Sequence, residues 1–118
     1  MWVVDIRDET NPVPVATFIP DREKYFNRPG RFGAHNILEN ITTEGPWANL
    51  VFLTYFNAGL RAVDVSDPLK PKEVGCYVPA TPSTQEAIQS NDIGTDEHGR
   101  LYLIDRWGAG MHIVEYTG

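Results

Sequence analysis

The chain repeats its own sequence, and this repetition limits its fold more than any other feature. A shift of 51 residues places LVFLTYFNAGLRAVDV (50–65) on LYLIDRWGAGMHIVEY (101–116). A shift of 59 residues places the N-terminal segment on the same unit, with Val4-Asp5 on Val63-Asp64. Self-similarity at a period of about 50 residues is typical of solenoids, propellers and other arrays. The sequence therefore predicts a fold built from similar units in tandem.

The repeated unit is composed of β-strands. β-Branched and aromatic residues alternate with short turn sequences, such as Asn57-Ala58-Gly59 and the segment SDPLKP (66–71). The four strands of one unit are expected at 32–38, 50–56, 60–66 and 72–79. A four-stranded antiparallel meander repeated in tandem predicts an all-β fold made of β-propeller blades. No amphipathic helix of useful length is expected, because STQEAIQ (83–89) suffices for one turn at most.

The chain is too short to close a ring of such blades. We expect a single partial propeller over residues 1–118, in which 1–20 supplies the last two strands of one blade, 32–80 a full blade, and 90–118 the first three strands of another. A blade buries both faces against its neighbours, so the outer faces of this array need a cover. Three alternatives remain open: a fragment of a larger propeller, several copies in one ring, or a small sandwich.

The segment LVFLTYFNAGLRAVDVSDPLKPKEVGCYVP (50–79) resembles the LVIVD repeat, in which a Leu-Val-Ile-Val-Asp-like strand precedes Ser-(Asp/Asn)-Pro and a Pro-X-Glu-(Val/Leu)-Gly strand. WVVDIRDETNPVPVATF (2–18) is similar to the end of such a unit. The resemblance implies a β-propeller, often in bacterial or archaeal proteins that are exported or lie on the cell surface. It implies no reaction. A fainter resemblance, carried by His35 and His112, is to selenium-binding-protein-type propellers, and it implies metal binding by histidines at the ring mouth.

Charge and hydropathy exclude several classes of partner. The formal net charge is −6, which disfavours nucleic acid and anionic lipid as partners. No apolar run approaches the roughly 20 residues that cross a bilayer, and the first residues lack the features of a signal peptide. A soluble acidic protein is expected. The one cysteine, Cys76, lies in an apolar strand pattern and is expected to be buried.

Polar residues recur where the first strand of each unit is expected. His35 and Asn36 lie in one such strand, and Asn91 and Asp92 lie in the next. First strands line the channel of a propeller, so these side chains are predicted to converge as ligand-binding residues. His35 with a carboxylate also suits a divalent metal. The alternative is that these side chains only bind neighbouring loops or water.

Two arginines, Arg28 and Arg31, join these ligand-binding candidates, because the basic loop 20–33 is expected at the mouth of the channel and suits an acidic ligand. The alternative for this loop is that it is only solvated. The resulting prediction is a ligand- or protein-binding module, completed by self-association or by the remainder of a parent chain. The alternative is an enzyme whose site, with His35 and Asp92, forms only in the completed ring.

Other polar positions are expected to be structural. Asp5, Asp64 and Glu115 recur at one position of the unit and are predicted to accept hydrogen bonds from turn N–H groups. His98 is expected to be solvated in a turn. His112 aligns with Arg61 and is expected to face solvent or a neighbouring blade, and Trp107 aligns with Phe56 as a packing residue.

Overall fold

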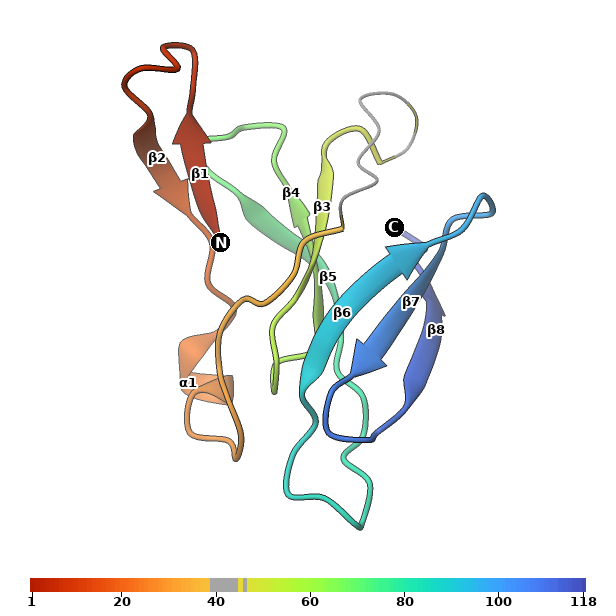
Figure 1. Cartoon of the computed structure of the whole chain (residues 1–118). Helices are drawn as coiled ribbons and strands as arrows, with labels where there is room; N and C mark the ends of the chain where they lie inside the picture. The colour runs from red at the N-terminus through yellow and green to blue at the C-terminus, as the bar shows by residue number, and fades with distance from the viewer. Residues whose placement is uncertain (39–44, 46) are drawn as a thin grey trace.

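A computed structural model describes residues 1–38, 45 and 47–118. It is an all-β structure with three small antiparallel sheets (Figure 1). The first sheet contains β1 (Trp2–Asp5) and β2 (Val13–Thr17). The middle sheet contains β3 (Leu50–Thr54), β4 (Leu60–Asp64) and β5 (Lys72–Tyr77). The third sheet contains β6 (Ser90–Thr95), β7 (Arg100–Asp105) and β8 (Met111–Glu115). Each sheet is a meander in chain order, as the turn sequences predicted.

The first sheet reproduces the pairing of β4 with β5 when it is shifted by 59 residues. Trp2 pairs with Thr17 as Arg61 pairs with Cys76, and Asp5 pairs with Val13 as Asp64 pairs with Lys72. Even the irregularity in register, a β-bulge, falls at the same step of the two ladders. A bulge at one fixed position is a feature of the repeated unit. The repeat found in the sequence is therefore a structural repeat.

The turn after β1 also matches the turn after β4. Asp5 Oδ1 accepts a hydrogen bond from the backbone N–H of Arg7 at 3.0 Å, and Asp64 Oδ1 accepts one from Ser66 at 2.8 Å. The prediction that the recurring acid binds turn N–H groups is confirmed at these two positions. The Arg7 side chain also donates to Asp5, and these hydrogen bonds lower the pKa of Asp5 to about 2.

The hairpins of the middle and third sheets differ by one residue at the tip. Tyr55 N–H donates to Gly59 O, whereas Asp105 N–H donates to Gly110 O. Because Leu50 pairs with Asp64 and Arg100 pairs with Glu115, β3 matches β7 at an offset of 50, while β4 matches β8 at 51. The sequence comparison used a single offset of 51, which is wrong for the strands before the turn, β3 and β7. Trp107, aligned with the buried Phe56, is half exposed.

Two hydrophobic clusters hold the sheets together. One lies between the middle and third sheets; its buried members are Leu38, Phe52, Leu60, Ala62, Ile93, Leu101 and Leu103. The other lies between the middle and first sheets; its buried members are Phe18, Tyr25, Leu53, Tyr55, Ala58 and Val63. The middle sheet thus buries both faces, and the side chains of β3 alternate between the two clusters.

The outer faces of the array are apolar and exposed. On the first sheet these side chains are Trp2 and Val4, and on the third sheet they are Ile104, Met111 and Ile113. Cys76 was expected to be buried, but it is exposed. It lies on β5, which forms the edge of the middle sheet, so no further strand of that sheet covers it.

One short helix, α1 (Arg22–Tyr25), lies in the basic loop where no helix was expected. Asp21 caps it by accepting a hydrogen bond from Lys24 N–H at 3.1 Å, and Tyr25 is buried. Residues 83–89 form no helix. In the part of the chain that the structure describes, no helix has the length and apolarity to cross a bilayer.

Candidate functional site

The site begins with residues 35–38, which lie along β3 as a first strand of the middle sheet. His35 N–H donates to Thr54 O at 3.0 Å, Thr54 N–H donates to Asn36 O at 2.9 Å, and Ile37 pairs with Leu53 as an isolated bridge. The expected strand at 32–38 is therefore present as this short pairing. In the third sheet, β6 holds the equivalent first position.

The first strands of the middle and third sheets lie side by side. Thr54 is fully buried, and its hydroxyl donates to the carbonyl oxygen of Asn91 at 2.7 Å. His35 Nδ1 approaches the same carbonyl oxygen at 2.8 Å. Because a carbonyl oxygen only accepts, Nδ1 is the donor of this hydrogen bond, and the neutral form of the ring leaves Nε2 as an acceptor. The Asn91 main chain therefore orients His35.

A second link joins Asn36 to Asp92. The Asn36 side-chain amide donates to the Asp92 carboxylate, whose Oδ1 also accepts from Ile93 N–H at 2.8 Å. The Asn36 amide oxygen accepts from Ile37 N–H at 3.1 Å. The four predicted residues from the two first strands are thus brought together, with Asn91 contributing its main chain. Two of these side chains, His35 and Asp92, are exposed.

Phe56 forms an aromatic floor beside this cluster. Its ring packs edge-on to His35, with 5.0 Å between ring centroids, and the Arg31 guanidinium lies 5.9 Å from the Phe56 centroid. Arg31 N–H also donates to Gln89 Oε1 at 3.0 Å. Phe56 holds a positive φ of 36°, an uncommon conformation for this residue type. Arg31 therefore lies beside the same Phe56 ring as His35.

Arg28 lies elsewhere. Its guanidinium stacks on Tyr25 at 4.7 Å, and it lines a separate cavity of about 180 Å³ together with Asn57 and Glu86. Asn57 Nδ2 donates to Arg28 O and Pro29 O at 3.3 and 3.2 Å, which fixes this loop against the hairpin tip. The two arginines of the basic loop therefore lie in different places, Arg31 beside Phe56 and Arg28 beside Tyr25.

The cluster is a hydrogen-bonding surface more than a cation cage. No group of three His, Cys, Asp or Glu side chains suited to a metal ion occurs within residues 1–38, 45 and 47–118. The Asp92 carboxylate is already engaged by Asn36 and Ile93. His35 and Asp92 are each hydrogen-bonded to a different neighbour, His35 to Asn91 O and Asp92 to the Asn36 amide. Comparison with family models, curated proteins and solved structures gives no match.

Sequence reasoning missed two members of the site, Thr54 and Phe56. Thr54 is polar at a position of β3 that is otherwise apolar, and this break in the pattern was a usable signal. The position of Phe56 beneath the cluster depends on its positive φ, which the residue pattern does not predict. His98, by contrast, is exposed in a turn, as expected.

The remaining histidine, His112, faces the neighbouring sheet. Its Nδ1 lies 3.2 Å from Tyr77 Oη, so β8 contacts β5 through this pair. The aligned residue, Arg61, is buried, donates to Glu73 at 3.2 Å and stacks over Tyr25 at 4.5 Å. His112 was expected to face solvent or a neighbouring unit, and it contacts the neighbouring sheet, whereas Arg61 contacts Glu73 of its own sheet and Tyr25 of the basic loop.

Proposed function

We propose that the chain is a binding module of the β-propeller type, in which the three sheets are successive blades of LVIVD-like sequence. The observation that supports this most is the side-by-side arrangement of residues 35–38 and β6, which brings His35, Asn36 and Asp92 onto one surface. Successive blades of a propeller place their first strands together around a channel, where ligands bind. The repeated register and bulge of β2 and β5 support the same architecture.

The outer faces indicate how such a module is completed. Trp2 and Val4 correspond by the repeat to Arg61 and Val63, which face the preceding sheet. Met111 and Ile113 correspond to Leu60 and Ala62, which face the following sheet. Within the chain, the face of the middle sheet that carries Leu60 and Ala62 packs on the third sheet. We therefore propose that the face of Met111 and Ile113 packs on the face of Trp2 and Val4 in a second copy, or on further sheets of a parent chain.

The ligand proposed for the polar cluster is a small molecule that carries hydroxyl or amino groups. Its donors would reach His35 Nε2 and the Asp92 carboxylate, and Arg31 would bind an acceptor on the same molecule. The buried Phe56 ring packs against His35 and Arg31 and helps to hold these two side chains in position.

Two measurements test this function. Sedimentation of the chain should show concentration-dependent association, which Ile113→Glu should abolish while the circular dichroism spectrum stays unchanged. A concentration-independent monomer with both faces exposed contradicts the module architecture.

For the ligand, amide chemical shifts are recorded during titration with small polyols, amino compounds and divalent cations. Binding should move the amides of residues 35, 36, 91 and 92. His35→Ala should weaken binding at least about tenfold, because it removes an acceptor and a ring. The matched control His98→Ala, in an exposed turn, should leave it unchanged. Equal loss in both variants, or no shifts at these four residues, overturns the assignment.

A further inference from the structure

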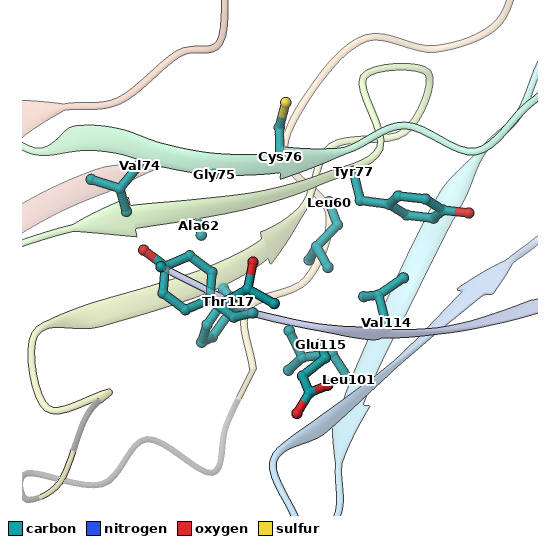
Figure 2. Close-up of a pocket in the computed structure, with 13 residues that line it drawn as sticks. Leu60, Ala62, Val74, Gly75, Cys76, Tyr77, Leu101, Val114, Glu115 and Thr117 are labelled. Carbon is teal, nitrogen blue, oxygen red and sulfur yellow. The ribbon is translucent and has the colours of Figure 1, made fainter.

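Two cavities of the described structure differ in the chemistry of their walls. One, of about 220 Å³, lies between the middle and third sheets, and apolar side chains such as Leu60 and Val114 form much of its lining (Figure 2). The other, of about 180 Å³, lies at the tip of the β3–β4 hairpin and is termed the tip cavity. It is lined by Arg28, Asn57 and Glu86 together with apolar residues. Charged and amide groups in one cavity can orient a bound molecule.

The walls of the tip cavity are held in place by hydrogen bonds. Asn57 Nδ2 donates to Arg28 O at 3.3 Å, which ties the basic loop to the hairpin. Arg31 N–H donates to Gln89 Oε1 at 3.0 Å, which ties the same loop to the segment before β6. The lining residues come from this loop, the hairpin tip and residues 78–88, so the cavity lies within the array and not at one of its outer faces.

Asn57 is buried with one polar atom unpartnered. The residue is 2% exposed, and its Nδ2 donates to carbonyl groups of the basic loop, whereas its Oδ1 has no hydrogen-bond partner among the residues that the structure describes. A buried acceptor without a partner costs free energy, and a donor on a bound molecule would remove this cost. One water occupies roughly 30 Å³, and the tip cavity has several times that volume. It therefore has room for a molecule larger than water.

Two residues of opposite charge line the same cavity. The Arg28 guanidinium, which offers only donors, is restrained by stacking on Tyr25 at 4.7 Å. The Glu86 carboxylate offers only acceptors. The four ion pairs found among the described residues include neither Arg28 nor Glu86. A molecule that carries both a carboxylate and an ammonium group could therefore form a charge-assisted hydrogen bond with each of them.

The apolar part of the lining restricts the rest of the ligand. Val78, Pro79, Ala87 and Ile88 are apolar, and the last three are buried. Such a surface favours an aliphatic group over a polar one. A volume of about 180 Å³ is smaller than the roughly 300 Å³ at which pockets for drug-sized ligands begin, so the ligand is a small molecule.

We propose that the tip cavity is a second binding site, for a free α-amino acid with a short aliphatic side chain. The carboxylate of the amino acid binds the Arg28 guanidinium, and its ammonium group donates to Glu86 and to Asn57 Oδ1. The carboxylate is the acidic group that the sequence predicts for a ligand of the basic loop. The site is separate from the polar cluster around His35 and does not depend on the propeller architecture proposed above.

The test titrates the full chain with three related compounds and records amide chemical shifts. L-Valine should move the amides of residues 28, 57, 81 and 86–88. L-Valinamide lacks the carboxylate, and N-acetyl-L-valine lacks the ammonium group. Each should bind at least about tenfold more weakly than L-valine, because it loses one charge-assisted hydrogen bond. This comparison needs no substitution in the chain.

Two variants assign the charges. Arg28→Gln should weaken L-valine binding about tenfold and leave the residual binding of L-valinamide unchanged, because that compound has no carboxylate. Glu86→Gln should weaken L-valine binding to the same extent and leave N-acetyl-L-valine binding unchanged. The matched control is Arg22→Gln, because Arg22 lies in the same loop and stacks on Phe26 at the same 4.7 Å but does not line the cavity. This variant should bind L-valine as the native chain does.

Several results would overturn the proposal. Equal binding of the three compounds, no shifts at residues 28, 57 and 86–88, or equal losses in Arg28→Gln and Arg22→Gln each contradict it. Acetate binding as tight as that of L-valine would make the cavity a site for anions only. L-Valine shifts confined to residues 35, 36, 91 and 92 would assign the amino acid to the polar cluster instead. The two sites report through different amides, so the two proposals fail separately.

Discussion

The middle and third sheets use equivalent strands in opposite surroundings. Leu60 and Ala62 of β4 are each 4% exposed, whereas their counterparts on β8, Met111 and Ile113, are each 55% exposed. All four residues are apolar, and each pair holds the same place in its ladder. The difference arises because the third sheet covers the face of Leu60 and Ala62, whereas no sheet among the described residues covers the face of Met111 and Ile113. Burial in this array is set by the neighbouring sheet and not by the strand itself.

The hairpin tips of these two sheets differ in the same way. A Cβ atom added at Gly59 would lie 2.3 Å from Tyr77 O, because the end of β5 passes over the tip. A Cβ atom added at Gly110 would meet nothing within 4 Å. Both glycines adopt positive φ, at 77° and 84°. The local conformation is therefore shared, and only the crowding differs.

The largest contrast is expected from truncation of the paired apolar residues. Leu60→Ala should lower the free energy of unfolding by about 2–5 kcal/mol, because it leaves a cavity between two sheets. Met111→Ala should change it by less than about 0.5 kcal/mol in the monomer, because this side chain is already in water. Urea unfolding at low protein concentration measures both. Equal losses would show that β8 is covered even in the monomer.

A second contrast comes from the hairpin tips. Gly59→Ala should cost about 3 kcal/mol, from the left-handed conformation and from the clash with the β5 main chain. Gly110→Ala should cost about 1 kcal/mol, since only the conformational term applies. Thermal unfolding of the two variants provides the measurement. A smaller loss at Gly59 than at Gly110 would mean that β5 does not cover the tip.

The aligned polar pair should give a smaller contrast. Arg61→Ala removes the hydrogen bond to Ala58 O and the stacking on Tyr25, and should cost about 1–3 kcal/mol. His112→Ala removes one hydrogen bond, that with Tyr77, and should cost about 0.5–1.5 kcal/mol. Chemical denaturation distinguishes the two values. A reversed order would place the more important inter-sheet contact at the third sheet.

The smallest effect concerns Asp96 in the turn between β6 and β7. Desolvation acts to raise its pKa, but hydrogen bonds from Tyr102, Arg100 and His98 outweigh it and hold the pKa well below 3.8. Because the folded-state pKa is the lower one, the stabilisation is complete above pH 3.8 and disappears as the pH falls through the folded value. Carboxyl NMR titration should place the pKa of Asp96 below 3.8, and Asp96→Asn should flatten the acid limb of the stability curve. A normal titration at Asp96 would contradict the hydrogen-bond network.

The sequence predicted the strands and turns because their signals are local. The turn at Asn57-Ala58-Gly59, the Ser-Asp-Pro turn and the recurring acids at Asp5 and Asp64 are present as expected. The face of each strand was harder to predict. The hairpin between β7 and β8 is one residue longer than the hairpin between β3 and β4, so β3 matches β7 at an offset of 50 while β4 matches β8 at 51. In a strand, an error of one residue in the alignment exchanges the two faces. For the same reason Trp107 was misplaced as a packing residue.

The candidate site was predicted in part. His35, Asn36, Asn91 and Asp92 converge because first strands of equivalent sheets lie together, which the repeat implies. The contribution of the Asn91 main chain and the separate place of Arg28 depend on backbone geometry and on α1, and neither has a residue signature. The prediction that Cys76 is buried was wrong because an apolar pattern does not distinguish a central strand from an edge strand.

The bulge shared by β2 and β5 has a further effect on shape. It increases the local twist and turns the last strand of each sheet away from its neighbour. The middle and third sheets are joined by hydrogen bonds near β3 and β6, whereas between β5 and β8 they touch at Tyr77 and His112 and leave the 220 Å³ cavity beside this contact. In the propeller architecture proposed above, additional units would curve around the side that carries His35 and would not extend as a straight filament.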